Sequence, residues 1–197
     1  HYMVPELEDA AEIRVAGTKL FDEYREAKRL RIETKPVLIG AFTLLKLARY
    51  SGTKKAEDYI QDTAAAYGAV LEQLDAMDAQ WIQLDEPELV TDLSADDITL
   101  FAKLYSQILS SKRNVKVLLQ TYFGDVRDIY GTLQSLPFDG IGLDFVEGKQ
   151  SLALVRQQGF AKDKTLFAGV INGKNIWKNQ YRHTLALVAE LRKYADN

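Results

Sequence analysis

Hydrophobic and polar positions along this chain alternate between two spacings. Short, nearly continuous apolar runs are typical of strands that are buried on both faces. Such runs occur over residues 35–42, 81–85, 115–123, 138–145 and 165–171. Between them, apolar residues recur every three or four positions, which is the spacing of one helix face. This second pattern predicts helices over residues 5–31, 44–50, 57–78, 94–108, 125–133, 149–158 and 175–194.

The regular alternation of strands and helices indicates an α/β fold with a parallel sheet. Two architectures are built in this way, the open doubly wound sheet and the eight-stranded (β/α)8 barrel. The five units average about 39 residues each, so eight units would need more than the 197 residues present. The count of units by itself therefore favours an open sheet of five strands, because a barrel requires that about three strands be missing.

Composition excludes several classes of partner and of site. The chain is 47% hydrophobic and 27% charged, with 12 Gly and 4 Pro, which is the balance of a globular domain. Its formal net charge is −3 and it has no basic block, so a nucleic-acid partner is not expected. The sequence contains no cysteine and only two histidines, His1 and His183. A disulfide is therefore excluded, and a zinc site within the chain is not expected.

Other features of the sequence are interpreted as structural. The segment from Gly169 to Gly173 lacks the third glycine and the Lys-Ser/Thr pair of a phosphate-binding loop. Gly140 and Gly142 lie inside a strand instead of between a strand and a helix. Both pairs indicate places where a neighbouring element packs close to the backbone. His183 has no acid or hydroxyl at a matching helical spacing, so it is interpreted as a surface residue. The first residues lack a basic stretch followed by a long apolar run, so no signal peptide or membrane anchor is expected.

Polar residues gather at the carboxyl end of each predicted strand, where both architectures place their ligands. The candidate substrate-binding residues are Asp85, Glu86, Tyr122, Asp144 and Asn172. Because Asp85 and Glu86 are adjacent on a strand, their side chains point to opposite faces and only one can enter a central cavity directly. We expect the other candidates to converge with Asp85, and Glu86 to point away.

Two alternatives for these acids stay open. A strand-terminal acid of the Asp85–Glu86 pair can serve a structural purpose by accepting hydrogen bonds from loop amides. Asp85 together with Asp144 or Glu147 could also supply the two carboxylates of a glycosidase-type barrel, a role that depends on their separation.

Six segments, in order along the chain, resemble the N-terminal barrel of cobalamin-independent methionine synthase. They are His1–Glu6, Lys35–Gly40, Trp81–Pro87, Gln120–Phe123, Gly140–Gly148 and Ala168–Trp177. One small departure is Ala41, which stands where the family usually has proline. The resemblance spans essentially the whole chain and implies that the five strands are the third to seventh of a (β/α)8 barrel.

The resemblance also implies an activity for a longer parent protein with two such barrels. That activity is transfer of the methyl group of 5-methyltetrahydropteroyl-polyglutamate to homocysteine, with a zinc ion that activates the homocysteine thiolate. The family's zinc ligands are His, Cys, Glu and Cys in its C-terminal barrel, and nothing in this chain matches them. No catalytic residue is therefore carried over, and Asp85-Glu86-Pro87 resembles a motif that recurs in the C-terminal barrel, where it helps hold homocysteine.

The sequence thus leads to one principal interpretation and one alternative from another class. Residues 1–197 are expected to form part of the N-terminal barrel of a cytoplasmic methyltransferase of methionine biosynthesis and to contact the C-terminal barrel of the same polypeptide. Alone, the chain is expected to bind no zinc and to be inactive. The alternative is a non-catalytic scaffold that closes the folate site. Because the two edge strands would lack their neighbours, we also expect the isolated chain to self-associate.

Overall fold

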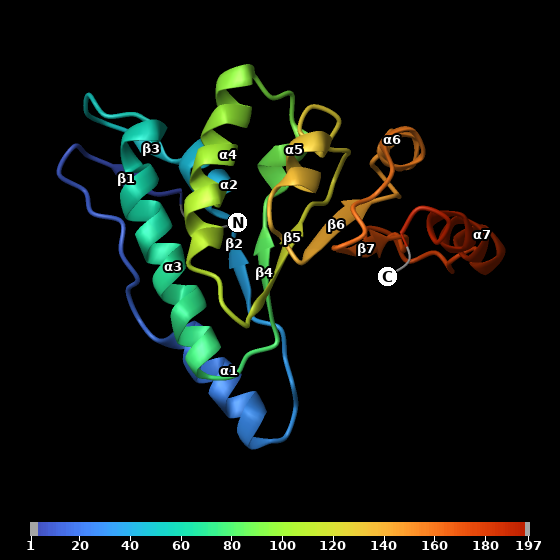
Figure 1. Cartoon of the computed structure of the whole chain (residues 1–197), viewed down its shortest axis with the longest axis horizontal. Helices are drawn as coiled ribbons and strands as arrows, with labels where there is room; N and C mark the ends of the chain where they lie inside the picture. Colours follow the sequence, from blue (N-terminus) through green and yellow to red (C-terminus); the bar gives the residue numbers. More distant parts are fainter. Residues whose placement is uncertain (1–3, 196–197) are drawn as a thin grey trace.

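The computed structural model describes residues 4–195 and contains a five-stranded parallel sheet (Figure 1). In spatial order its strands are β2 (Val37–Ile39), β4 (Trp81–Asp85), β5 (Lys116–Gln120), β6 (Gly140–Asp144) and β7 (Thr165–Gly169). A separate parallel pair joins β1 (Glu6–Leu7) to β3 (Arg49–Tyr50). All five predicted strands are therefore confirmed, β4 with the predicted bounds and the other four with shorter ones.

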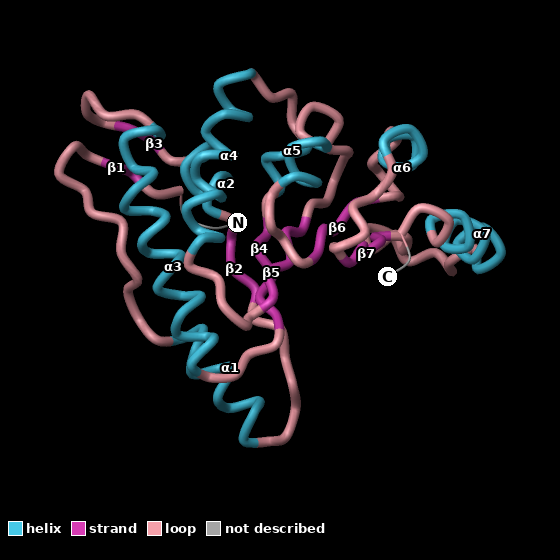
Figure 2. The backbone as a smooth tube through the Cα atoms, viewed as in Figure 1, coloured by secondary structure: helices cyan, strands magenta, loops and turns pink. Residues whose placement is uncertain are grey.

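Helices connect the strands and cover the sheet. They are α1 (Lys19–Arg29), α2 (Ala41–Leu47), α3 (Ile60–Ala76), α4 (Ala95–Ser110), α5 (Tyr130–Ser135), α6 (Ser151–Gln158) and α7 (Tyr181–Leu191), with short 3-10 turns η1 (Ala56–Tyr59) and η2 (Pro87–Val90). Figure 2 shows α3 and α4 packed side by side next to the sheet, with α6 and α7 at its other end. The N-terminal and C-terminal segments thus belong to opposite ends of the sheet.

The order of the strands distinguishes between the two predicted architectures. Each strand of the sheet pairs with the next one along the chain, in the order β2-β4-β5-β6-β7, without the reversal that defines a doubly wound sheet. Sequential parallel pairing with a helix in each connection is the topology of a (β/α)8 barrel. The open doubly wound sheet that the unit count favoured is therefore wrong.

The sheet curls so that its two ends face each other across a concave inner surface. The ring of Phe167, on the last strand, packs edge-on against Trp81 with centroids 5.4 Å apart, and it lies 5.2 Å from the Lys35 ammonium just before the first strand. Glycines on β6 make room for these contacts. A Cβ at Gly140 would lie 2.8 Å from the Phe167 ring, and one at Gly142 would lie 2.1 Å from the Gln120 amide oxygen. The close packing predicted at this glycine pair is confirmed.

The hydrophobic core lies between the sheet and its helices. Strand side chains alternate between the two faces, and those that face the helices are fully buried, as Ile82 and Leu84 on β4 show. The largest buried side chains of the helix layer are Tyr24, Phe42, Tyr59, Phe101, Tyr105 and Tyr130. Burial of a large apolar side chain stabilises the fold by about 1.5–3 kcal/mol. This layer therefore fixes the strand ends relative to one another.

The predicted helix over residues 5–31 is wrong in its first half. Residues 6 and 7 instead pair as β1 with β3, and regular helix begins only at Lys19. The Asp9 carboxylate accepts hydrogen bonds from the Thr53 N–H and hydroxyl and from the Lys54 N–H, at 2.8–3.0 Å. These long-range bonds hold the segment in extended form, so tertiary contacts override the apolar spacing.

The predicted last helix begins too early. Asn172 Oδ1 accepts the Lys174 N–H and Asn175 Oδ1 accepts the Trp177 N–H, both at 2.9 Å. Such bonds satisfy backbone donors locally and compete with a helix. Regular structure therefore starts at Tyr181, not at Asn175.

The other predicted helices are present, with shifted ends. The helix predicted over 125–133 is shorter and begins at residue 130, and the one predicted over 44–50 spans residues 41–47. The Ser94 hydroxyl accepts the Asp97 N–H at 3.1 Å, and the Asp97 carboxylate accepts the Ser94 N–H at 3.0 Å, so the two residues form a capping box at the start of α4. Gly159 ends α6 with a φ of +74°, a backbone conformation that favours glycine.

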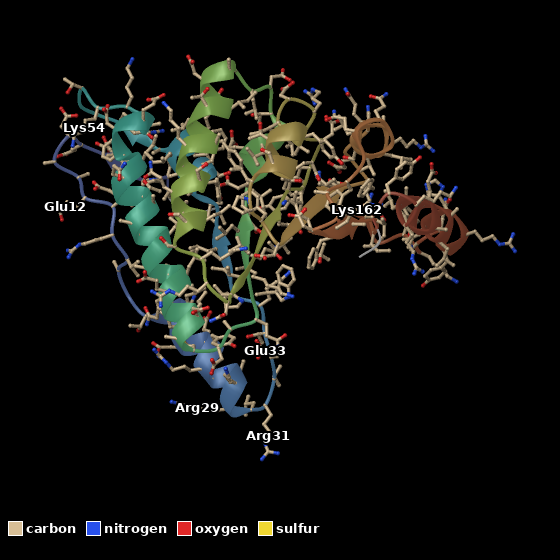
Figure 3. All side chains as sticks on the ribbon, in the orientation of Figure 1. Glu12, Arg29, Arg31, Glu33, Lys54 and Lys162 are labelled. Atoms are coloured by element: carbon tan, nitrogen blue, oxygen red, sulfur yellow. The ribbon has the colours of Figure 1, made fainter. Side chains whose placement is uncertain are left out.

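Charged side chains extend from the outer surface of the molecule. Figure 3 shows Arg29, Arg31 and Glu33 at one tip, around the turn that ends α1, whereas Glu12 and Lys54 lie at the end that carries β1 and β3. Within residues 4–195, no helix has the length and apolar character needed to cross a membrane.

Candidate functional site

The carboxyl ends of β5, β6 and β7 surround a cavity of about 420 Å³. Tyr122, Asp144 and Asn172, three of the five candidate residues, line it. Parallel strands place their carboxyl ends at one edge of a sheet, which explains why these residues meet. Asp85 lies at the same end of the sheet, paired in register with Gln120, but it does not line this cavity.

Asp85 is directed to the concave inner face of the sheet. Its Oδ1 accepts a hydrogen bond from Gln83 Nε2 at 2.8 Å, and its side chain is only partly buried. Lys35 faces the same interior, where burial lowers the pKa of its ammonium group while the charge of Asp85 acts in the opposite direction. Asp85 is therefore an interior carboxylate that lies outside the cavity lined by Tyr122, Asp144 and Asn172.

Glu86 has no access to the cavity, so its selection as a substrate-binding candidate is corrected. It points away from Asp85, as the strand alternation predicted, and is completely buried. Its carboxylate accepts hydrogen bonds from the Phe42 N–H (2.9 Å), the Thr43 N–H (2.7 Å), the Thr43 hydroxyl (2.6 Å) and the Tyr105 hydroxyl. A Cβ at Gly40 would lie 2.1 Å from its Cδ, so only glycine fits there. Burial raises the pKa of Glu86 to about 7.

Asp144 holds together the two loops that border the cavity. Its Oδ1 accepts the N–H groups of Val146 (2.7 Å) and Glu147 (2.9 Å), and its Oδ2 accepts the N–H of Phe123 (2.9 Å). Three backbone amides thus occupy both carboxylate oxygens. Asp144 is therefore a positioning residue for the loops after β5 and β6, and its oxygens are already engaged.

Phe123 and Lys174 were not among the candidates, yet they make a cation–aromatic contact in the cavity. Phe123 has a φ of +72°, which is uncommon for a residue other than glycine, and its side chain is 59% exposed. The Lys174 ammonium lies 4.4 Å above the centre of the Phe123 ring and 2.7 Å from Glu147 Oε2. The positive φ is not visible in the sequence, where only the neighbouring Gly124 suggests a turn.

His183 belongs to a different part of the surface. It lies on α7 and lines a second cavity, of about 460 Å³, between that helix and the loop after β7. Its side chain is exposed, in agreement with its interpretation as a surface residue. Asn172 borders both cavities because it lies at the start of the loop that separates them.

The donor groups of this chain do not fit a zinc ion. The sequence has no cysteine, and residues 4–195 contain no group of three or more His, Asp or Glu side chains placed to hold a metal. Zinc sites in proteins depend on thiolate and imidazole ligands, with carboxylates as a minority. The zinc that the resemblance implies has no ligand set in the part of the chain described.

The fold and the strand-end cavity define this chain as part of a (β/α)8 barrel with its candidate site at the carboxyl ends of the strands. Comparison with known proteins gives the family. The sequence profile described as "Cobalamin-independent synthase, N-terminal domain" matches residues 1–196. The chain belongs to this family.

Curated relatives carry a consistent name. A protein of Campylobacter jejuni subsp. doylei is 53% identical over all 197 residues, which are 26% of its own length, and one of Streptococcus suis is 54% identical over 188 residues, or 95% of this chain and 25% of that protein. Both are named 5-methyltetrahydropteroyltriglutamate–homocysteine methyltransferase. This chain therefore spans about a quarter of the length of these relatives.

A solved structure supports the fold. The B12-independent methionine synthase of a Shewanella species superposes with a TM-score of 0.74 at 16% sequence identity. The match covers 93% of this chain and 57% of that chain. At this level of identity the likeness concerns the fold alone, and it agrees with the barrel topology.

Proposed function

We propose that this chain is part of an enzyme that transfers the methyl group of 5-methyltetrahydropteroyl-polyglutamate to homocysteine and so forms methionine. The observation that carries the proposal is the family match over residues 1–196, together with relatives above 50% identity that bear the name of this activity. In this proposal residues 1–197 form part of the N-terminal barrel domain. The C-terminal barrel, the zinc ion and the homocysteine site belong to the rest of the protein, and the location is cytoplasmic.

The cavity at the ends of β5 to β7 is the surface that we assign to substrate contact. Tyr122 and Asn172 are the proposed contacts, because both line the cavity. Asp144 contributes by holding the cavity loops, since three backbone amides occupy its oxygens. We assign no catalytic residue to this chain.

An exchange experiment tests the proposal. The matching segment of the Campylobacter jejuni relative is replaced by this chain, and methionine formation from methyl-folate and homocysteine is measured. Turnover within about tenfold of that relative supports the proposal, since 53% identity preserves the fold. A folded chimera that retains zinc but forms no methionine would contradict it.

The same chimera separates this proposal from the scaffold alternative. If the cavity contacts substrate, Tyr122→Phe and Asn172→Ala raise the KM for methyl-folate while leaving the unfolding temperature unchanged. If the chain only braces the other barrel, both variants leave KM unchanged. We do not propose the glycosidase-type alternative, because Asp85 does not line the cavity that Asp144 and Glu147 line.

A further inference from the structure

The Lys174 ammonium lies between an aromatic ring and a carboxylate of the same chain. It is 4.4 Å from the centre of the Phe123 ring, the shortest of the five cation–aromatic contacts in the described part of the chain, and 2.7 Å from the Glu147 carboxylate. An aromatic face and a carboxylate on one cation are the two groups by which proteins recognise organic ammonium ions. The contacts of Lys174 therefore show which chemistry this place accepts.

The site is fixed by the backbone and does not depend on Lys174 for its shape. Asp144 accepts the N–H of Phe123 through one oxygen and that of Glu147 through the other, at 2.9 Å each. These bonds hold Phe123 at its positive φ of +72°, a conformation that persists only where the surroundings enforce it. The Phe123 ring also packs edge-on against Tyr122, with centroids 4.7 Å apart. Two loops from different strands thus present a ring and a carboxylate to the same point.

Lys174, in contrast, comes from a loop without regular structure. The loop continues β7, and next to Lys174 is Gly173, where an added Cβ would meet no atom within 4 Å. Half of the Lys174 side chain is exposed. Its head group can therefore leave the ring and the carboxylate without disturbing the core.

We propose that Phe123 and Glu147 form a binding site for a small molecule with an organic ammonium group, and that Lys174 occupies the site as a tethered competitor. The cavity of about 420 Å³ falls within the range of small-molecule sites, so it has room beyond one ammonium head. The polar side chains of Gln120 and Asn172 also line it and can orient the remainder of a ligand. This site lies in the cavity assigned above to substrate contact, so the inference rests on that assignment and adds the class of group that Phe123 and Glu147 hold.

The test uses n-butylammonium, which reproduces the lysine side chain as a free molecule. Binding to the ¹⁵N-labelled chain is followed through the backbone amide signals of Phe123 and Glu147 at constant ionic strength. A short tether gives Lys174 a local concentration in the millimolar range, so Lys174→Ala should bind n-butylammonium about tenfold more tightly. The matched control is Lys178→Ala, which removes the same charge from the same loop and should leave the affinity unchanged.

Two double variants test the groups that form the site. Adding Phe123→Leu to Lys174→Ala removes the aromatic face but keeps an apolar side chain, and adding Glu147→Gln removes only the charge. Each should weaken n-butylammonium binding at least about threefold, since both contacts are with a partly exposed cation. Neutral n-butanol is the control ligand, and thermal unfolding verifies that each variant folds.

Three results would overturn the proposal. The first is a Lys174→Ala chain that binds n-butylammonium no more tightly than the unmodified chain or Lys178→Ala. The second is equal affinity in the double variants, and the third is equal binding of n-butanol. Tight binding that depends on the charge, on Phe123 and on Glu147 supports it.

Discussion

Replacement of Glu86 by glutamine should destabilise the fold, although the two side chains have nearly the same shape. Each carboxylate oxygen accepts two hydrogen bonds, one from a backbone N–H and one from a hydroxyl. In Glu86→Gln one oxygen becomes an NH2 group, which cannot accept. The facing hydroxyl, of Tyr105 or Thr43, can rotate and accept a hydrogen bond from the NH2 group. The facing backbone N–H of Phe42 or Thr43 can only donate. One buried backbone donor therefore loses its partner.

The size of the effect follows from these contacts. A buried donor without a partner costs about 1–3 kcal/mol. We therefore expect Glu86→Gln to lower the free energy of unfolding by about 1–3 kcal/mol at pH 7.5. This is a large part of the ~5–15 kcal/mol stability of a typical domain. Glu88→Gln, two residues further along, makes the same chemical change outside this network and should stay within about 0.5 kcal/mol.

The same carboxyl group should make stability depend on pH. Burial raises the pKa of folded Glu86 to about 7 from its ordinary value of 4.5, so the fold favours the protonated form. The resulting stabilisation is complete below pH 4.5 and is lost as the pH rises through 7. Its full size is roughly 3 kcal/mol, because one pKa unit corresponds to about 1.4 kcal/mol. The difference in stability between the unmodified chain and Glu86→Gln should therefore widen as the pH falls from 8 to 5.

Urea unfolding followed by circular dichroism between pH 5 and pH 8 measures both effects. The free energy of unfolding of the unmodified chain, compared with that of Glu86→Gln, isolates the contribution of Glu86 at each pH. A Glu86→Gln chain that unfolds within 0.5 kcal/mol of the unmodified chain would refute the role of the four hydrogen bonds. A pH-independent difference between the two chains would refute the raised pKa.

Three further predictions concern other parts of the molecule. Asp144→Asn keeps only one accepting oxygen, so it should lower stability by about 1–2 kcal/mol and shift the Phe123 amide signal; unchanged thermal unfolding would contradict this. The isolated chain should retain no stoichiometric zinc after dialysis against a weak chelator and should form no methionine, and either retention or turnover would show the prediction to be wrong. Light scattering over a dilution series should show self-association, whereas a constant mass of 22.3 kDa would exclude it.

Much of the fold could be predicted from the spacing of apolar residues alone, because strands that are buried between a helix layer and the barrel interior consist of continuous apolar runs. The alternation of side chains along a strand also placed Asp85 and Glu86 on opposite faces, as the structure has them. The alternation could not predict which groups form hydrogen bonds with the Glu86 carboxylate. Its partners Phe42 and Tyr105 lie 44 and 19 residues away, and only the tertiary packing of α2 and α4 on β4 brings them to it.

The candidate site, too, could be predicted only where the positions of its residues follow from the strands themselves and not from contacts between distant loops. Tyr122, Asp144 and Asn172 meet because parallel strands end together, a rule that needs no coordinates. The positive φ of Phe123 and the position of Lys174 over its ring depend on hydrogen bonds between different loops. The helix predicted from residue 5 failed for a related reason, since the pairing of β1 with β3 outweighs the helical spacing.

The two edges of the sheet are not equivalent. The prediction from the number of strands had treated both edge strands as equally unpaired. At the β2 edge, the Tyr67 hydroxyl donates to the Ile39 carbonyl oxygen at 2.7 Å and so satisfies one group that would otherwise be unpaired. At the β7 edge, no strand within residues 4–195 pairs with the outer side, and exposed Ile171, Ile176 and Trp177 follow it. An edge with free backbone groups beside apolar side chains is where another strand adds most readily. Self-association of the isolated chain should therefore proceed through β7.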